Sequence, residues 1–443
     1  MSDQHSRPAA RPGRSHREDR LTVGVVGTGY VGLTSAACLA HLGHRVTGVD
    51  IDADKVALLR RGEVPIAEPG LGELVNARLA DGSLSFTTDL AGLATAEVVL
   101  LCVPTPVHSD GTTDLRAFDA AVETLSDVLD RDCVVVIKST VPVGTTERTA
   151  RALGRATVSN PEFLREGHAV HDFLNPDRIV IGATEATAAD RVAALYEGVS
   201  APVLRTEPAS SELGKYASNA FLALKVSYVN VLTELSERLG AEVIDVAETM
   251  RLDPRIGTAF LSPGPGWGGS CLPKDTRALL HAAKQAGVDF AVLADAMAAN
   301  RRQHERVVEK VREAVTGSPD GSLAGLRLGL LGLTFKAGTD DVRESPALAV
   351  AALLAEAGAV LTGYDPGVDR TADVRPVHVV DDPTLVAKDS AGLVLLTEWP
   401  QFRALDWAQL AELADRPTVV DARNLLEAEA VTRAGFAYHR LGR

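Results

Sequence analysis

A glycine-rich turn between a β-branched run and an apolar helical stretch constrains the fold of this chain more than any other feature. Gly27, Gly29 and Gly32 form the sequence GTGYVG directly after the run at 23–26. The first glycine permits a tight turn, and the second lets a pyrophosphate approach backbone N–H groups at the positive end of the helix. The third allows the helix to pack closely. The turn therefore predicts a dinucleotide-binding domain with parallel strands.

An acidic residue at the end of the next predicted strand narrows the choice of dinucleotide. Asp50 follows the run at 45–49 and lies 18 residues beyond Gly32. A carboxylate at this place binds both ribose hydroxyls and repels a 2′-phosphate, so the expected cofactor is NAD rather than NADP. Lys55 is either a neighbour of that cofactor or a solvated lysine.

Short β-branched runs alternate with helical stretches in two parts of the chain, which is typical of parallel sheets with crossover helices. The first part has runs at 21–26, 45–49, 98–103 and 133–138, and the second has a strand at 326–333, a helix at 346–357 and a strand at 360–364. The part between them is mainly helical, and the stretch 211–239 has apolar residues on more than one face. Such a helix is buried between domains or subunits, which favours a homodimer or a larger homo-oligomer.

We therefore predict an α/β protein with two doubly wound, Rossmann-like domains joined by a long central helix and a helical middle domain. The expected boundaries are a flexible tail over 1–20, a first α/β domain over 21–206, the helical part over 207–315 and a second α/β domain over 316–443.

Composition excludes several classes of protein. The chain has 45 Lys and Arg against 59 Asp and Glu, and the net charge of −14 would repel a nucleic-acid backbone. No apolar run reaches the roughly 18 residues that span a membrane, and no signal peptide is evident, so we expect a cytoplasmic protein without a membrane partner. The four cysteines form no CxxC pair and the histidines show no ligand spacing, so we expect neither a disulfide framework nor a metal.

The most unusual segment is SPGPGWGGSCLPKDT, residues 262–276. Its glycines leave little side-chain bulk, so the backbone can wrap closely around a ligand, and Pro273 suits the first turn of a helix. Cys271 would then stand at the helix N-terminus, where the helix field and a nearby ammonium favour the nucleophilic thiolate. Asp275 would share its face and could take a proton from water. The alternative is an inert buried cysteine.

Basic residues elsewhere are candidates for binding negative charge. Lys215 and Asn219, in ELGKYASNAF, stand four apart and would point to one side of a helix, where Lys215 could stabilise an oxyanion or simply be solvated. Lys336, Arg343 and Arg423 follow predicted strands of the second α/β domain and suit phosphates or carboxylates, with surface salt bridges as the alternative.

Two further segments follow strands of the first domain. In NPEFLREG, Asn160 and Pro161 are typical of an N-cap and a first helical residue, with Glu162 and Glu166 one turn apart. These acids could hold a catalytic water or a sugar, or merely complement the helix dipole. Thr140 ends the KST segment before Pro142, where doubly wound sheets place ligands.

Seven motifs in order resemble the UDP-glucose/GDP-mannose dehydrogenase family, from about residue 21 to the C-terminus. They are GTGYVG, KSTVPVG, NPEFLREG, ELGKYASNAFLALK, GWGGSCLPKDT, GLTFKAGTDDVRES and DARN. The resemblance implies that the C6 alcohol of a nucleotide sugar becomes a carboxylate while two NAD+ are reduced in turn. It also implies that 21–206 binds NAD, 207–315 dimerises and 316–443 binds the sugar nucleotide.

The resemblance assigns roles to residues that match the family's motifs. Cys271 would form a thiohemiacetal and then a thioester, Lys215 and Asn219 would stabilise the oxyanion, Asp275 and Thr140 would position water, and Glu162 would assist proton transfer. Implied cofactor contacts are Gly27, Gly29, Tyr30, Val31, Gly32, Asp50, Lys55, Thr105, Thr140, Glu166 and Arg343. Implied substrate contacts are Glu162, Phe163, Leu164, Lys215, Asn219, Arg255, Phe260, Gly268, Lys336 and Arg423, with Arg255 donated across a dimer.

The substrate is the least constrained part of this hypothesis. The segments GWGGSCLPKDT and TEWPQF favour the UDP-glucose branch of the family, and dTDP-glucose, GDP-mannose or a UDP-N-acetylhexosamine are alternatives. A two-electron hydroxyacid dehydrogenase using Lys215 and Asn219 is a further alternative, but it leaves Cys271 and the glycine loop unexplained. A silent dinucleotide sensor would need none of these polar residues.

Overall fold

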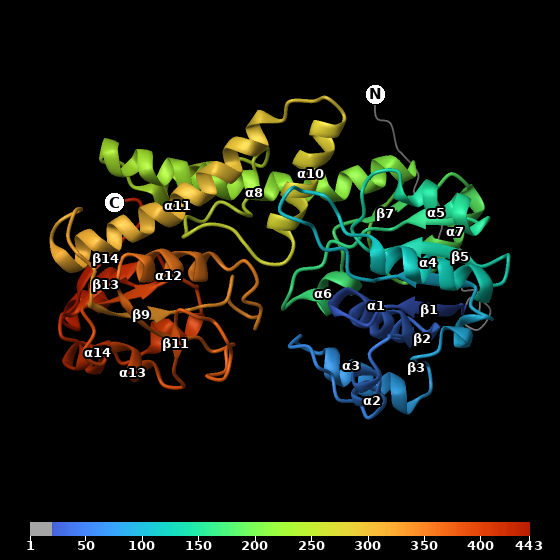
Figure 1. The fold of residues 1–443 in the computed structure, drawn as a ribbon, viewed down its shortest axis with the longest axis horizontal. Coiled ribbons are helices and arrows are strands. Elements are labelled where there is room, and N and C mark those ends of the chain that lie inside the picture. The colour runs from blue at the N-terminus through green and yellow to red at the C-terminus, as the bar shows by residue number, and fades with distance from the viewer. Residues whose placement is uncertain (1–19) are drawn as a thin grey trace, which may run out of the picture.

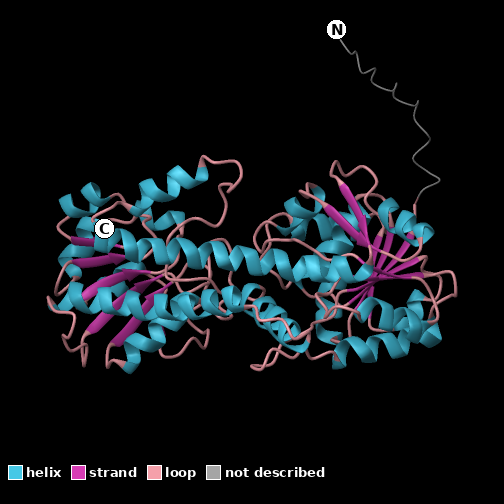
Figure 2. Ribbon diagram, turned by 90° about the horizontal axis from the view of Figure 1, so that it is seen from above, coloured by secondary structure: helices cyan, strands magenta, loops and turns pink. Residues whose placement is uncertain are grey.

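The structure is a computed structural model that describes residues 20–443. Two parallel sheets lie at opposite ends of an elongated molecule, and long helices run between them (Figures 1 and 2). This arrangement confirms the predicted α/β class with two doubly wound domains and a helical middle part. The predicted tail lies outside the described residues, apart from Arg20.

The first domain is built on an eight-stranded sheet in the order β3-β2-β1-β4-β5-β6-β7-β8. All neighbouring strands are parallel except β6 and β7, and valine and leucine side chains on both faces of the sheet are buried under helices. The strands are β1 (Thr22–Val26), β2 (Arg45–Val49), β3 (Leu84–Thr87), β4 (Val98–Leu101), β5 (Val134–Ile137), β6 (Thr157–Ser159), β7 (Ile179–Gly182) and β8 (Val203–Thr206). The helices are α1 (Tyr30–His41), α2 (Ala53–Arg60), α3 (Leu71–Ala80), α4 (Arg116–Val128), α5 (Thr145–Leu153), α6 (Ala169–Leu174), α7 (Ala186–Ala194) and the short η1 (Leu90–Leu93).

The middle part consists of α8 (Pro208–Leu239), α9 (Val243–Arg251), α10 (Leu272–Gln285) and α11 (Ala291–Thr316). Helix α8 begins at a proline, whose fixed φ suits a first turn, and is followed by Gly240 in a left-handed conformation with φ 71°. Both α10 and α11 pack against α8. Because α8 starts beside the first sheet and ends beside the second domain, it connects the two ends of the molecule (Figure 1).

The second domain has a six-stranded, fully parallel sheet in the order β11-β10-β9-β12-β13-β14. Its first five strands therefore follow the same pattern as β3-β2-β1-β4-β5 of the first domain. The strands are β9 (Arg327–Leu331), β10 (Val360–Tyr364), β11 (His378–Val379), β12 (Gly392–Leu395), β13 (Thr418–Asp421) and β14 (Ala437–Arg440). The helices are α12 (Pro346–Glu356), α13 (Pro383–Ala387), α14 (Trp407–Leu413), α15 (Ala428–Arg433) and the short η2 (Pro400–Ala404).

The two α/β domains repeat one local interaction. Asp50 follows β2 and accepts hydrogen bonds from the backbone and hydroxyl of Thr28, at 2.9 and 2.8 Å. Asp365 follows β10 and accepts the same pair of bonds from Thr334, both at 2.9 Å. Trp399 Nε1 also donates to Asp365, and this carboxylate is only 3% exposed. In the second domain, the hydrogen bonds of Asp365 therefore hold the edge of the sheet together.

The helix expected to begin at Pro161 does not form, because the next helix, α6, begins at Ala169. Asn160 is buried, and its side chain accepts bonds from Lys138 Nζ and the Tyr196 hydroxyl while donating to the Val180 carbonyl. It is therefore not available as an N-cap. The segment after it instead remains an irregular loop at the carboxyl edge of the sheet.

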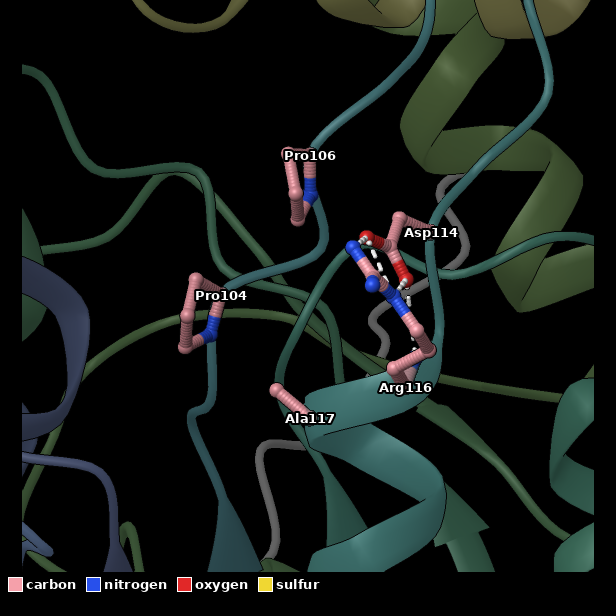
Figure 3. A pocket seen from close by; sticks show the side chains of 5 residues that line it. All are labelled: Pro104, Pro106, Asp114, Arg116 and Ala117. Carbon is pink, nitrogen blue, oxygen red and sulfur yellow. Dashed lines mark hydrogen bonds and ion pairs between the residues drawn. The ribbon is translucent and has the colours of Figure 1, made fainter.

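The first domain contains a hollow at the carboxyl end of β4. It measures about 290 Å³ and is lined by Pro104, Pro106, Asp114, Arg116 and Ala117, between the segment after β4 and the start of α4 (Figure 3). Asp114 and Arg116 pair with each other on one side of it, at 2.5 Å (Figure 3). No helix within residues 20–443 is long and apolar enough to cross a membrane.

Candidate active site

The three glycines of GTGYVG each have a separate steric role. Gly27 has φ 89° and donates to the Val49 carbonyl, which fixes the turn after β1. A Cβ on Gly32 would lie 1.8 Å from the Gly27 carbonyl oxygen, so only glycine fits there. A Cβ on Gly29 would meet nothing within 4 Å, so open space lies over the N-terminus of α1. The turn therefore fits a dinucleotide pyrophosphate.

Asp50 stands at the end of β2 with one strong cation beside it. Lys55 Nζ lies 3.0 Å from Asp50 Oδ2, and Asp50 Oδ1 accepts from the Asp52 backbone at 3.1 Å. Burial raises the pKa of Asp50, but the hydrogen bonds from Thr28, Asp52 and Lys55 outweigh it, so the pKa lies below its usual value. The carboxylate is charged at neutral pH, as recognition of ribose hydroxyls requires.

Tyr30 and Val31 open α1 but face different partners. The Tyr30 hydroxyl bonds to the Glu68 carboxylate and accepts from the Gly167 backbone at 2.9 Å. Burial and the Glu68 charge raise the pKa of Tyr30, so the phenol stays neutral. Val31 packs against the core of the first domain. Tyr30 thus links the glycine turn to the loop that carries Glu166.

Thr105 and Thr140 follow adjacent strands, β4 and β5. The Thr105 hydroxyl donates to the Thr140 carbonyl at 2.7 Å, so the two segments are joined at the carboxyl edge of the sheet. Lys138, two residues earlier, is buried and donates to Asn160 and Tyr196. It therefore holds the domain core, whereas Ser139 and Thr140 are half-buried at the end of the strand.

Cys271 immediately precedes α10, as the sequence predicts, and part of its side chain is open to solvent. The expected lowering of its thiol pKa is wrong. Partial burial of the thiol raises its pKa, and the carboxylates of Glu162 and Asp275 add to this effect, so the pKa of Cys271 lies above its usual value. Lys215 lowers the pKa, but it does not outweigh those contributions.

Lys215 and Glu162 form a buried ion pair. Lys215 Nζ lies 2.9 Å from Glu162 Oε1 and 2.6 Å from the Glu162 carbonyl, and the two side chains are 5% and 9% exposed. The Leu164 backbone donates to the other Glu162 oxygen at 2.7 Å, and the Phe163 ring lies 5.1 Å from Lys215 Nζ. The pair holds the 162–164 loop against α8.

The two charges of this pair support each other. Burial raises the pKa of Glu162, but Lys215 outweighs it and the pKa lies below its usual value. Burial lowers the pKa of Lys215, but Glu162, Asp275 and Cys271 outweigh it and the pKa lies above its usual value. Lys215 is therefore an ammonium at neutral pH.

Asn219 and Asp275 form a second buried pair, one turn along α8 from the first. Asn219 Nδ2 donates to Asp275 Oδ2 at 2.6 Å, and Lys274 Nζ lies 2.5 Å from Asp275 Oδ1. Asp275 is 1% exposed and its backbone donates to the Cys271 carbonyl at 2.9 Å. Helices α8 and α10 thus bring Lys215, Asn219, Cys271 and Asp275 together.

A polar cluster joins the loop after Asn160 to the second domain. Lys336 Nζ donates to the Glu166 carbonyl at 2.5 Å, and Arg343 lies 3.6 Å from Glu166 Oε1 while pairing with Asp341 at 2.6 Å. The Ser270 hydroxyl donates to Glu166 Oε1 at 2.7 Å. Glu166 and Arg343, expected on the cofactor side, therefore lie next to the cysteine loop.

The glycines before Cys271 have a role different from the one predicted. A Cβ on Gly266 would lie 2.7 Å from both Asn300 and His304, and one on Gly268 would lie 2.0 Å from the Glu344 carbonyl oxygen. A Cβ on Gly269 would lie 2.8 Å from the Phe335 ring. These glycines let the loop pass between α11 and the second domain, so protein atoms, rather than a ligand, explain their size.

Arg423 lies beside the same loop. Its guanidinium donates to the Leu396 carbonyl at 2.9 Å and pairs with Glu398 at 3.1 Å, and it lies 3.0 Å from where a Cβ on Gly264 would stand. A longer bond reaches the Phe335 carbonyl, next to Lys336. Lys336, Arg423 and the loop therefore lie on one side of the second domain.

Arg255 and Phe260 are predicted substrate contacts for which the structure gives no contact with this cluster among residues 20–443. Arg255 is 87% exposed and pairs with Asp253, within its own loop. Phe260 is 37% exposed, with φ 62°. Neither Ser270, which lies inside the GWGGSCLPKDT motif, nor Glu68, which lies in none of the seven motifs, was predicted from the sequence.

Within residues 20–443, no group of three or more His, Cys, Asp or Glu side chains is arranged to hold a metal ion.

Comparison with known families and structures decides the identity of the fold. Models of the UDP-glucose/GDP-mannose dehydrogenase family match residues 21–200 (NAD binding domain), 209–302 (central domain) and 329–428 (UDP binding domain). The chain belongs to this family. It is an NAD-dependent nucleotide-sugar dehydrogenase.

Relatives match over nearly the whole length. A UDP-glucose 6-dehydrogenase of Rhizobium meliloti is 41% identical over 96% of this chain and 100% of its own. A UDP-glucose dehydrogenase structure from Pyrobaculum islandicum has a TM-score of 0.86 at 38% identity, covering 96% of this chain and 99% of that one. A UDP-D-ManNAc dehydrogenase structure from Pyrococcus horikoshii has the same TM-score at 28% identity, covering 96% and 99%.

Proposed function

We propose that the protein oxidises UDP-glucose to UDP-glucuronate in two steps through a covalent bond to Cys271. The observation that carries this proposal is the position of Cys271, open to solvent at the start of α10 and surrounded by the Lys215–Glu162 and Asn219–Asp275 pairs. A two-electron dehydrogenase has no use for a nucleophile at this place.

NAD+ bound over the GTGYVG turn would accept one hydride from C6 in each of the two steps. Gly27, Gly29, Gly32 and Asp50 would hold it, and the open space above Gly29 supports this assignment. The intermediate aldehyde must be retained between the two steps. A thiolate retains it covalently, because addition of Cys271 Sγ to C6 gives a thiohemiacetal.

Lys215 and Asn219 would stabilise the negative charge on the C6 oxygen. Lys215 is held as an ammonium by Glu162, so its charge is already in place when the oxyanion forms. Asn219 is oriented by its bond to Asp275. Loss of a second hydride from the thiohemiacetal gives a thioester.

Hydrolysis of the thioester would use the remaining polar groups. Asp275 and Thr140 would position a water molecule, and Glu162 would assist proton transfer to and from Lys215. Attack of that water on C6 breaks the C–S bond, releases the carboxylate and returns Cys271 to the thiol. Lys336 and Arg423 would bind the sugar nucleotide, with Phe163, Leu164 and Gly268 lining its path.

UDP-glucose is the proposed substrate because the relatives of about 40% identity that match the chain end to end are UDP-glucose 6-dehydrogenases. The UDP-D-ManNAc dehydrogenase shares the fold at lower identity, so a UDP-N-acetylhexosamine is the alternative. The domain boundaries at 206/207 and 315/316 remain a proposal, supported by family-model matches that end at 200 and 302 and resume at 209 and 329.

The function is tested by counting NADH formed per sugar on a panel of UDP-glucose, dTDP-glucose, UDP-N-acetylglucosamine and GDP-mannose. We expect two NADH per UDP-glucose and much slower reaction of the others. Cys271→Ser should lose overall turnover by orders of magnitude and still bind NAD. One NADH per sugar, with free aldehyde accumulating, would contradict the proposal.

We also propose that the protein is a homodimer formed along α8. Six large apolar side chains recur on the exposed surface of this helix, each 46–72% exposed. They are Leu213, Phe221, Tyr228, Val231, Leu235 and Leu239. Their spacing of three, four, seven and eight residues places them in one stripe, and such a stripe is typical of a helix covered by a partner. A second copy would also bring its Arg255 to a neighbouring site.

The dimer is tested by light scattering after size-exclusion chromatography. Phe221→Asp should give a monomer, whereas Thr249→Asp on α9 should remain a dimer. A wild-type monomer at micromolar concentration would contradict the proposal. The expected cytoplasmic location remains a prediction, supported by the four unpaired thiols, which suit a reducing compartment.

A further inference from the structure

Cys271 lacks an obvious base, although the proposed chemistry requires its thiolate. Within residues 20–443, the one hydrogen-bond partner of Cys271 Sγ is the Ser270 hydroxyl, at 3.6 Å. Neither Asp275 nor Glu162 contacts the sulfur, and both raise its pKa. A group that removes the thiol proton must therefore act through Ser270 or through water.

The Ser270 hydroxyl has a second partner on its other side. It donates to Glu166 Oε1 at 2.7 Å. This bond points the Ser270 hydroxyl hydrogen at Glu166. The lone pairs of Ser270 Oγ can therefore accept the hydrogen of the Cys271 thiol. The three groups thus form a chain in which each donates to the next, from Sγ to Oγ to Oε1.

Glu166 can accept a proton because it faces another carboxylate. Its second oxygen, Oε2, is buried and has no hydrogen-bond partner. Burial and the neighbouring Asp341 raise the pKa of Glu166. The Arg343 guanidinium lies 3.6 Å from Glu166 Oε1 and 2.6 Å from Asp341 Oδ2, so the two carboxylates share one cation. The Arg343 guanidinium fixes Asp341 by donating three hydrogen bonds to its carboxylate.

We propose that Ser270 is a catalytic residue of the reaction proposed above, passing the proton of Cys271 to the Glu166–Asp341 carboxyl pair. The S–H bond of Cys271 breaks as its proton moves to Ser270 Oγ. The hydroxyl proton of Ser270 moves to Glu166 Oε1. The pair gains one proton, and the negative charge that it loses appears on Sγ, where Lys215 and Arg343 attract it.

This relay matters only after the first hydride has left. Oxidation of the C6 alcohol to the aldehyde does not need the thiolate, whereas addition of sulfur to the aldehyde does. Loss of the relay should therefore slow the second NADH and leave the first unchanged. A residue that merely supports the loop would change both phases or the affinity for substrate.

The test is a stopped-flow measurement of NADH formation with enzyme in excess over UDP-glucose at saturating NAD+. For Ser270→Ala we expect the first NADH at the wild-type rate and the second slowed about 100-fold, in the range of general acid–base catalysis. Ser270→Thr keeps a hydroxyl and should recover most of the rate. KM for NAD+ and for UDP-glucose should stay within about twofold of wild type.

A control variant and a variant of the proton acceptor complete the test. Ser218→Ala removes an exposed hydroxyl on α8 that donates to the Gly214 carbonyl within its own helix, and it should leave both phases unchanged. Glu166→Gln removes the carboxylate that accepts the proton from Ser270. The double variant Ser270→Ala/Glu166→Gln should slow the second phase no more than Glu166→Gln alone, because both changes interrupt one path.

The outcomes separate this inference from the proposed function. If wild type forms two NADH per sugar and Ser270→Ala does so at the same rate, the relay is refuted while the function stands. A 100-fold loss that Thr does not recover, or a loss confined to KM, also refutes the relay. If wild type forms only one NADH, the proposed function itself fails.

Discussion

Removing Lys215 from its buried pair gives a prediction that joins stability to catalysis. In Lys215→Met, the Glu162 carboxylate keeps the Leu164 N–H at 2.7 Å but loses Lys215, its ion-pair partner, while its own side chain is 9% exposed. Breaking one half of a buried pair costs about 3–5 kcal/mol, since it leaves an uncompensated charge. We expect a loss of unfolding free energy of this size at pH 7.

The pH dependence follows from the same pair. The folded pKa of Glu162 lies below its usual value, so the pair's stabilisation is present above the unfolded pKa and disappears as the pH falls through the folded pKa. In Lys215→Met this stabilisation is absent, and Glu162 can take up a proton more readily. The difference in unfolding free energy between the variant and wild type should therefore shrink as the pH is lowered from 7 toward 4.

The assay is denaturant unfolding at several pH values, with NADH formation measured on the same samples. Lys215→Met/Glu162→Gln should recover about 2 kcal/mol of the loss, because no unpaired charge remains. Turnover should fall at least about 100-fold in both variants, since the oxyanion loses its cation. Lys225→Met, on the same helix with one bond to a backbone carbonyl, should cost less than about 1 kcal/mol. Equal effects of Lys215→Met and Lys225→Met would refute the reasoning.

Three other changes test separate parts of the structure. Gly32→Ala puts a Cβ 1.8 Å from the Gly27 carbonyl oxygen and should abolish NAD binding by calorimetry; wild-type affinity would contradict the steric argument. Asp50→Asn removes the charge that repels a 2′-phosphate and frees Lys55, so the preference for NAD over NADP in kcat/KM should fall at least about tenfold; an unchanged ratio would place the ribose elsewhere. Burial lowers the pKa of His304 to about 4, so unfolding free energy should drop by up to about 3 kcal/mol from this group as the pH falls from 6.5 to 4, and His304→Leu should flatten that slope; parallel curves for the two proteins would refute it.

Local patterns account for what the sequence predicted well. The strands at 45–49 and 360–364 coincide with β2 and β10, because β-branched runs bounded by turn residues need no distant partner to be recognised. The glycine turn was recognisable from its own spacing after a β-branched run, although Cys102 and Val103, which follow β4, also press against Gly27 and Gly32. The order of such elements was enough to predict two doubly wound domains.

Contacts between residues far apart in the chain account for the features that the sequence predicted poorly. Asn160 was an expected N-cap, but Lys138, Val180 and Tyr196 engage its side chain, and none of them is near it in sequence. The thiol pKa of Cys271 was expected to fall because the adjacent helix suggests it, whereas Glu162, which lies on another element, contributes to raising it. Local chemistry alone could not give either result.

The roles of the glycine loop and of Ser270 also depend on packing. Positions 268 and 269 require glycine because Glu344 and Phe335 of the second domain, about 70 positions away in the chain, leave no room for a Cβ. Ser270 is unremarkable in sequence, and only its bonds to Glu166 and Cys271 distinguish it. Motifs therefore locate the site, while the contacts among its side chains determine their protonation.

The most direct test of the account is to look for the sugar on Cys271. Enzyme mixed with UDP-glucose and NAD+ is quenched in acid within one turnover, digested, and examined by mass spectrometry. The account predicts a nucleotide-sugar adduct on the peptide that contains Cys271 and none in Cys271→Ser. Two NADH per sugar with no adduct on the wild-type enzyme at any quench time, together with a Cys271→Ser variant that turns over as fast as wild type, would contradict it.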